Sequence, residues 1–416
     1  MNWLVMILTA LVLNIVSSHA DEYHYKDLLI GERAIGLGGA FVAISDDPSG
    51  IYYNPAGILF GLENYLSVSA NAVTSSEQTY EDIYPGQNYI YKSRDLAPVL
   101  FGFTQSFMKS KVGFAVIVPN SDLIDQSDSV SGPGRSFTRK FFRENMTYLM
   151  GPAFATEVFE NFSLGVSLFG SMRTVKTIDN TTVLYDPIGT GKYFVHIMNM
   201  SQQSYLFVPK VGVQYMPVPK WSFGITLSKI FNVSSSGQAR VVRTKSGSDN
   251  LPVNPNGTFN NDMETISLDN VFADVADPLN VALGWAYFHT KHLLFSGELD
   301  VYEGLGSYRE YPLAGTMNWA LGAEYYIFDS LATRVGFFSN NSNSRPVVER
   351  SVNQAPHVDL LGLSTGVSLY REGTSLTLSV AYQTGHGLGQ AFADGTLTQR
   401  VRESKLTLYL AGSYQL

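Results

Sequence analysis

The sequence predicts an all-β protein: a fourteen-stranded antiparallel transmembrane β-barrel with an N-terminal hatch, or plug, inside its lumen. From about Tyr65 to Leu416, fourteen segments carry apolar residues at every second position, the pattern of strands with one apolar face. Each has about the ~10 residues that a tilted strand needs to cross a bilayer. The connections alternate between tight turns and long stretches, and this alternation is typical of barrels whose turns lie on one side of a membrane and whose loops lie on the other.

The composition is consistent with this fold and excludes several functions. Only 15% of the residues are charged, whereas a soluble domain has about 25%. Aromatic residues reach 13%, as expected if rings gather at both membrane interfaces. The net charge of −8 argues against a nucleic-acid partner, which needs basic side chains to neutralise phosphates. Because the chain has no cysteine, it has no disulfide, thiol nucleophile or cysteine-based metal site.

Residues 1–20 are predicted to be a signal peptide. An apolar run from Leu4 to Val16 is followed by small and polar residues that end at Ala20, which matches an h-region and a cleavage site. An uncleaved membrane anchor is the alternative, but the run is short and has no flanking charges. We therefore expect an exported protein whose mature chain begins at Asp21.

Residues 21–62 lack the two-residue period and are predicted to form the hatch. They are rich in Gly and Ala, and small residues with tight turns suit a compact plug more than a free-standing domain of this size. Asp47 and Pro48 predict the N-cap and first turn of a short helix. Asn54 and Pro55 then predict an extended or turn conformation that ends it.

Residues 63–416 are predicted to form the barrel. The expected strand centres are Val68, Phe101, Val116, Leu149, Val166, Val211, Ile225, Leu283, Gly297, Leu321, Val335, Thr365, Leu378 and Leu408. The tight turns are expected near Ser110, Glu160, Pro219, Lys291, Asp329 and Glu372. Alternate residues should face the lumen and be Ser, Thr, Gly or an occasional ion.

Two connections are predicted to be long loops, residues 176–204 and 232–278. The first contains an apolar run with Phe194, Ile197 and Met198. One interpretation is a surface on which an apolar ligand first lands. The other is a strand that continues past the membrane.

Four charged residues fall on the inward phase of neighbouring strands: Glu298, Asp300, Glu324 and Arg334. Glu324 is expected opposite Arg334, as an ion pair that also anchors the hatch through Arg33. The alternative is a site that binds a ligand carboxylate. The sequence contains no recognisable catalytic set and no histidines at metal-ligand spacing, so we expect neither an enzyme, nor a metal site, nor a cofactor.

A motif in the hatch carries a family resemblance. After a Gly/Ala-rich run come an Asp-Asp step and an Asn-Pro-Ala-Gly turn: Asp46, Asp47, Asn54, Pro55, Ala56 and Gly57. This stretch resembles the hatch of the FadL/TodX-type outer-membrane transporters of hydrophobic compounds, including long-chain fatty acids, and also their PorV-like branch. The resemblance implies a fourteen-stranded barrel, ligand capture between the loops after strands five and seven, and a pocket in the lumen.

The third strand contains Gly113 and Pro119, two residues that weaken a strand ladder. In the resembling family, a kink in this strand makes a lateral exit through the wall. We expect the same here, with an interrupted ladder from Gly113 to Pro119 and an apolar path leading to it. The alternative is that Pro119 only ends the strand at the rim.

The leading hypothesis is therefore an outer-membrane transporter, expected to be a monomer, that binds fatty-acid-like small molecules and passes them to a lateral opening. Its expected partners are membrane lipid and the hydrophobic ligand. The alternative is a PorV-like scaffold that docks an outer-membrane partner protein for protein export or surface attachment.

Overall fold

The computed structural model describes residues 23–132, 135–185, 193–246, 262–269, 278–305, 313–349, 351, 354–391 and 398–415. The predicted signal peptide, residues 1–20, lies outside them. Three short helices come first: α2 (Glu32–Gly36), α3 (Gly50–Tyr53) and η1 (Gly57–Phe60). The strands are β1 (Asn64–Tyr84), β2 (Gln87–Ala97), β3 (Leu100–Phe107), β4 (Ser110–Gly132), β5 (Arg135–Phe159), β6 (Phe162–Tyr185), β7 (Tyr193–Val218), β8 (Trp221–Lys229), β9 (Phe231–Ser246), β10 (Asp262–Asp269), β11 (Leu279–Phe288), β12 (Leu293–Tyr302), β13 (Thr316–Phe328), β14 (Leu331–Asn340), β15 (His357–Arg371), β16 (Thr374–Gly389) and β17 (Gln399–Gln415). None of the described helices is long and apolar enough to span a membrane.

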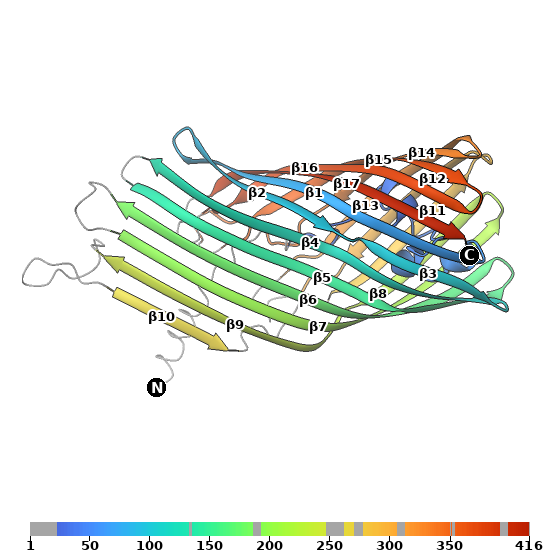
Figure 1. Cartoon of the computed structure of the whole chain (residues 1–416), viewed down its shortest axis with the longest axis horizontal. Coiled ribbons are helices and arrows are strands. Elements are labelled where there is room, and N and C mark those ends of the chain that lie inside the picture. Colours follow the sequence, from blue (N-terminus) through green and yellow to red (C-terminus); the bar gives the residue numbers. More distant parts are fainter. Residues whose placement is uncertain are drawn as a thin grey trace, which may run out of the picture.

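These strands form one closed antiparallel barrel (Figure 1). β1 pairs with β17 and so closes the sheet. β2 and β3 are two halves of one barrel strand, because β1 pairs with both. β8 and β9 are likewise two halves of one barrel strand, because β7 pairs with both. On their other side β11 pairs with β8 and β10 pairs with β9, so β10 and β11 are also two halves of one barrel strand. The barrel therefore has the fourteen strands that the sequence predicts.

The predicted alternation of inward and outward residues is confirmed. On β6, Ser163 and Ser167 are fully buried, whereas Leu164 and Leu168 have exposed fractions of 39% and 44%. Successive side chains of a strand point to opposite faces, so one face of each strand can meet lipid and the other the lumen.

The six predicted tight turns are also confirmed. They lie at one end of the barrel, which we call the turn end, at residues 108–109, 160–161, 219–220, 289–292, 329–330 and 372–373. Asn161 (φ 62°) and Gly373 (φ 76°) adopt the left-handed conformation that such short connections require.

The prediction of long loops is wrong for most of residues 176–204 and for about half of residues 232–278, where residues 247–261 and 270–277 lie outside the described residues. β6 and β7 continue through most of the first range and β9 and β10 through much of the second. Beyond the membrane neither face of a strand needs to be apolar, so the two-residue period that identifies the spans disappears there. As a result β4 to β7 contain 23 to 26 residues each, and Figure 1 shows them extending far beyond the shorter strands.

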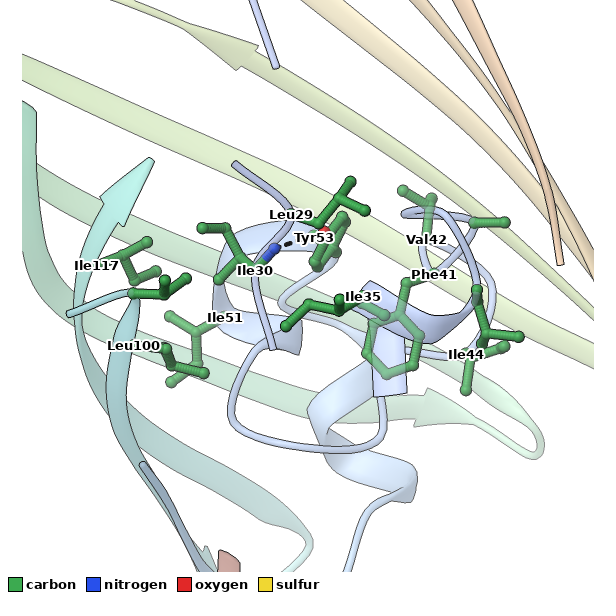
Figure 2. Packing of buried hydrophobic residues seen from close by; sticks show 14 of the residues in the cluster. Leu29, Ile30, Ile35, Phe41, Val42, Ile44, Ile51, Tyr53, Leu100 and Ile117 are labelled. Atoms are coloured by element: carbon green, nitrogen blue, oxygen red, sulfur yellow. Dashed lines mark hydrogen bonds between the residues drawn. The ribbon is translucent and has the colours of Figure 1, made fainter. Parts of the chain in front are cut away.

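The chain before β1, residues 23–62, packs against the inner wall of the barrel, and we call it the N-terminal segment. Its side chains Ile30, Ile35 and Phe41 are fully buried. They belong to one cluster with the wall residues Leu100 and Ile117 (Figure 2). The lumen near the turn end is therefore filled by a hydrophobic core, with the helices of the segment inside the barrel (Figure 1).

Six inward-facing glycines of the wall let the N-terminal segment lie directly against the strands. We call them the glycine belt: Gly165, Gly212, Gly224, Gly284, Gly322 and Gly336. A Cβ atom at any of these positions would lie only 2.0–2.9 Å from an atom of the N-terminal segment. Such distances are shorter than a van der Waals contact, so no larger residue fits there without displacing the segment.

We predict that Gly165→Ala loosens the N-terminal segment and leaves the barrel intact. The added Cβ would lie 2.3 Å from the backbone nitrogen of Ala56, and overpacking of this kind costs about 1–3 kcal/mol. The measurement is ion conductance in planar bilayers, which should rise. Gly170→Ala on the same strand is the control, because its Cβ would meet nothing closer than 3.8 Å. Equal conductance of the two variants would contradict the prediction.

Candidate functional site

The Asn-Pro-Ala-Gly turn is tied to the wall by the side chain of Asn54, which is fully buried. Its Nδ2 donates hydrogen bonds to the carbonyl oxygens of Val42 (2.8 Å) and Val213 (3.1 Å). Its Oδ1 accepts one from the backbone N–H of Ala56 (3.1 Å). The amide thus holds the turn around Pro55, as the sequence predicts, and joins two parts of the N-terminal segment to β7.

Three glycines of the segment occupy positions that disfavour a larger residue. Gly38 and Gly39 have φ angles of +67° and +86°, values that favour glycine because it has no Cβ. A Cβ at Gly57 would lie 2.4 Å from the Cβ of Ser45.

The Asp-Asp step has two different roles. The carboxylate of Asp46 forms an ion pair with Arg33, in which Nη1 of Arg33 lies 2.5 Å from each of the two carboxylate oxygens. Asp47 is buried and accepts hydrogen bonds from the backbone N–H and the hydroxyl of Ser49, at 2.7 and 2.5 Å. Burial, together with the negative charge of Asp46, raises the pKa of Asp47 to about 6.

Arg33 also joins a buried network on the wall. Its Nη2 lies 2.7 Å from Oε1 of Glu324, and Nε of Arg334 lies 2.5 Å from Oε2 of the same carboxylate. Glu324 and Arg334 are directly opposite each other on β13 and β14, as the sequence predicts. The carboxylate thus binds a cation from the wall and one from the N-terminal segment, which anchors the segment.

Glu298 and Asp300 form a second, separate cluster around Lys26 of the N-terminal segment. The Nζ of Lys26 lies 3.0 Å from Oε1 of Glu298 and makes an ion pair with Asp300. The other oxygen of Glu298 accepts hydrogen bonds from the backbone N–H groups of Phe41 (2.9 Å) and Val42 (3.0 Å). Both predicted carboxylates therefore hold the segment, and the four lumen charges divide between two clusters.

A cavity of about 230 Å³ adjoins this second cluster. Its apolar lining comes mainly from Leu149, Phe169, Leu206, Val208 and Ile230. Its polar lining includes Lys26, Tyr52, Lys210, Asp300 and Tyr302. The described residues contain no group of three or more His, Asp or Glu suited to a metal ion. The lining of the cavity therefore combines an apolar part with a polar, charged part.

Lys210 is a cavity residue that we did not predict from the sequence. Its ammonium group donates to the carbonyl oxygen of Tyr52 and lies 4.9 Å from the centre of the Tyr52 ring. Within the described part of the chain, no carboxylate oxygen lies within 4.0 Å of it. Lys210 lies on the same inward-facing side of β7 as Gly212 and Gln214. The two-residue alternation of this strand could therefore have identified Lys210 as a lumen residue.

One side of the cavity reaches Pro119, where the hydrogen-bond pattern of the barrel wall changes. Gly113 has ordinary ladder partners on both sides, so the expected interruption does not include it. The ladder between β3 and β4 ends at Ile117, and the register of β4 against β5 shifts between Ile117 and Asn120. Because β4 continues to Gly132, the alternative in which Pro119 ends the strand is wrong.

Beyond Pro119, side chains join β2 to β4. The amide of Gln126 donates to the carbonyl oxygen of Ile90 (2.6 Å) and accepts from the N–H of Lys92 (3.0 Å). The hydroxyl of Ser93 donates to the carbonyl oxygen of Leu123 (2.7 Å). We call this boundary, residues 90–95 of β2 and 121–126 of β4, the seam. It is held by side-chain hydrogen bonds in place of a backbone ladder.

The predicted landing surface does not exist as a loop. Phe194, Ile197 and Met198 lie in β7, so the interpretation as an extended strand is correct. Ile197 faces outward and is 36% exposed, whereas Met198 is fully buried in a small cluster with Val175 and Val241. The alternation of the strand separates the side chains that the sequence groups together.

No family model matches the sequence, and no curated protein matches it. Several solved structures share its fold. A FadL homologue of Pseudomonas aeruginosa has 14% sequence identity and a TM-score of 0.64, over 94% of this chain and 99% of that one. The toluene transporter TodX of P. putida has 12% identity and a TM-score of 0.63, over 94% and 99%. The toluene transporter TbuX of Ralstonia pickettii has 13% identity and a TM-score of 0.62, over 94% and 99%. The chain therefore has the fold of FadL- and TodX-type barrels.

We predict that Asn54→Ala makes the barrel leaky without unfolding it. The carbonyl oxygens and the N–H group that Asn54 binds would lose a buried partner, at a local cost of about 1–3 kcal/mol. The measurement is leakage of a small dye from vesicles that contain the protein. Asn199→Ala on the exposed face of β7 is the control. Leakage as low as in the control would show that this turn does not seal the lumen.

We predict that the N-terminal segment loses stability as the pH rises through about 6. The pKa of Asp47 in the folded protein lies above its ordinary value of 3.8. The stability that this side chain contributes in its protonated form is therefore fully present below about pH 4 and is lost above about pH 6. A shift of about two units corresponds to about 3 kcal/mol. Hydrogen exchange of residues 45–53, corrected for the intrinsic pH dependence, should show this loss of protection. In Asp47→Asn the loss should disappear, and its persistence would refute the assignment.

Proposed function

We propose that this protein is an outer-membrane transporter that takes fatty-acid-like molecules into the lumen cavity and releases them sideways at the seam. The observation that carries the proposal is the position of the cavity. One side of it reaches Pro119, where the ladder of the barrel wall ends and the seam begins. A ligand in the cavity is thus next to a part of the described wall, between β2 and β4, that can open without breaking a backbone ladder.

The lining of the cavity supports an amphipathic ligand. An apolar body would pack against the side chains of β5 to β7, such as Phe169 and Leu206. A carboxylate would bind the ammonium group of Lys210, which lacks an acidic partner among the described residues. A charge-assisted hydrogen bond of this kind is stronger than a neutral one. Toluene, which the names of two structural neighbours mention, has no group for such a contact.

In this proposal residues 21–62 are the hatch, residues 63–416 the transmembrane barrel, and residues 1–20 the signal peptide of an exported, monomeric protein. The hatch blocks the straight path through the lumen, so a polar solute cannot pass by diffusion. A hydrophobic molecule avoids that block by leaving into the membrane, where its apolar body is favourably solvated. A PorV-like docking scaffold would have no need of a cavity that adjoins the seam.

We predict that a disulfide across the seam blocks transport. In Asp95→Cys/Ser121→Cys the bond would replace the hydrogen bond that the Ser121 hydroxyl donates to Asp95. The chain has no other cysteine, so this is the only disulfide that can form. Uptake of labelled oleate should stop on oxidation and return on reduction.

The purified wild-type protein tests the proposal independently. Mass spectrometry of extracted ligands should find a fatty-acid-like molecule, whereas a docking scaffold would retain none. Oleate uptake that is the same in the oxidised and reduced forms would rule out the lateral route. No uptake by the wild-type protein and no retained ligand would rule out the transporter.

A further inference from the structure

The cavity has a second polar region beside the start of the seam, and we call it the polar patch: Asn120 of β4, Thr147 of β5 and Ser171 of β6. All three residues line the cavity. Asn120 and Thr147 are directly opposite each other in the ladder. Ser171 is opposite Leu149, the next inward residue after Thr147, so it is the diagonal neighbour of Thr147 on the same face. Three adjacent strands thus bring three small polar side chains together.

The polar patch contains buried atoms that lack hydrogen bonds. Thr147 and Ser171 are only 7% and 5% exposed. Their hydroxyl oxygens and Oδ1 of Asn120 have no hydrogen-bond partner among the described residues. Such atoms are uncommon in native structures, because burial removes the water that would otherwise bind them. Since these three atoms belong to residues that line a cavity, a molecule inside the cavity is the partner that they can reach.

The polar patch and Lys210 lie at opposite ends of the cavity. Ser171 pairs with Leu206, which is four residues from Lys210 on β7. At about 3.3 Å per residue, the two polar groups are therefore roughly 13 Å apart along the wall. Between them lie the apolar side chains of Phe169 and Val208, which are opposite each other. The cavity thus has polar groups at two ends and an apolar middle.

The chemistry of the polar patch favours a hydroxyl group on the ligand. The hydroxyls of Thr147 and Ser171 can donate or accept, and Oδ1 of Asn120 can only accept. A ligand hydroxyl satisfies both kinds of group, because it donates to Asn120 and accepts from a neighbouring hydroxyl. A ketone has no hydrogen to donate to Asn120, and a second carboxylate would place a charged acceptor against another acceptor. Among these groups the hydroxyl is the one that leaves no acceptor unpaired.

We propose that the polar patch is a second binding subsite, and that the cavity selects long-chain fatty acids with a hydroxyl group part-way along the chain. This inference rests on the proposed function and specifies its substrate class. The carboxylate binds Lys210, the first part of the chain packs on Phe169 and Val208, and the hydroxyl binds the polar patch. The rest of the chain continues toward the seam, since Asn120 directly follows Pro119. A fatty acid without the hydroxyl would bury the polar patch against methylene groups and bind less tightly.

The test compares ricinoleate with oleate, because ricinoleate is oleate with one hydroxyl group in the middle of its chain. Each ligand displaces labelled oleate from the purified protein in detergent, and its partition into protein-free micelles is measured as a correction. Ricinoleate should bind about tenfold more tightly than oleate, the factor expected when a ligand hydroxyl supplies the hydrogen bonds that buried groups lack.

A double variant assigns this preference to the polar patch. Thr147→Val with Ser171→Ala removes both hydroxyls and nearly keeps the side-chain volumes. Ricinoleate should bind about tenfold more weakly than to the wild type, whereas oleate should bind equally or more tightly. Ser379→Ala on β16 is the matched control, because its hydroxyl is also buried without a partner among the described residues but lies outside the cavity lining. Heat-modified migration on gels shows whether each barrel has folded.

The possible results separate this inference from the proposed function. If oleate and ricinoleate bind equally well to the wild type, water alone satisfies the polar patch, and the transporter stands without this selectivity. A ricinoleate preference that persists in the double variant would also contradict the subsite. Lys210→Met should weaken both ligands by a similar factor, and loss of the preference there would place the hydroxyl at Lys210 instead. Binding of neither ligand would overturn both the subsite and the transporter.

Discussion

The structure depends on one constraint: the backbone of a segment without strands is buried inside a closed barrel, and each polar group that the segment does not pair within itself needs a partner from the wall. The wall meets this need in two ways. Glu298 and Glu324 of the wall bind backbone groups or cations of the segment, and a carbonyl oxygen of β7 accepts a hydrogen bond from Asn54 of the segment. Glycines let the two backbones touch. The inner surface of the wall is therefore specific for this one segment, and the space left over defines the cavity.

The same constraint explains why the weakest part of the wall lies where it does. A closed barrel has no free strand edge, so a break in the ladder needs substitute partners. At Pro119 and Ser121 the substitutes are Leu28 and Asp27 of the N-terminal segment, and further along they are side-chain amides and hydroxyls. Segment and seam are therefore parts of one arrangement, since the segment supplies hydrogen bonds that the wall lacks.

The strands that cross the membrane could be predicted because lipid on one face and the lumen on the other enforce alternation, as in Leu164 and Ser163. The partnership of Glu324 with Arg334 could be predicted because cross-strand register follows from a tight turn. β2, β9 and β10 could not be predicted, because polar residues fall on both alternating phases of these segments and hide the two-residue period. Nor could the ion pair between Asp27 and Lys405 be predicted, since a contact between residues 378 positions apart depends on how the N-terminal segment crosses the lumen.

The unequal lengths of the strands give the barrel an oblique rim. At about 3.3 Å per residue, the 23 to 26 residues of β4 to β7 extend much farther than the 10 to 13 of β11 to β14. In barrels of this kind the tight turns face the periplasm, so the tall side would stand outside the cell. An antibody or bacteriophage approaching the cell would therefore meet this sheet before it meets the short described strands β11 to β14, and the outward side chains of the sheet can vary without disturbing the lumen.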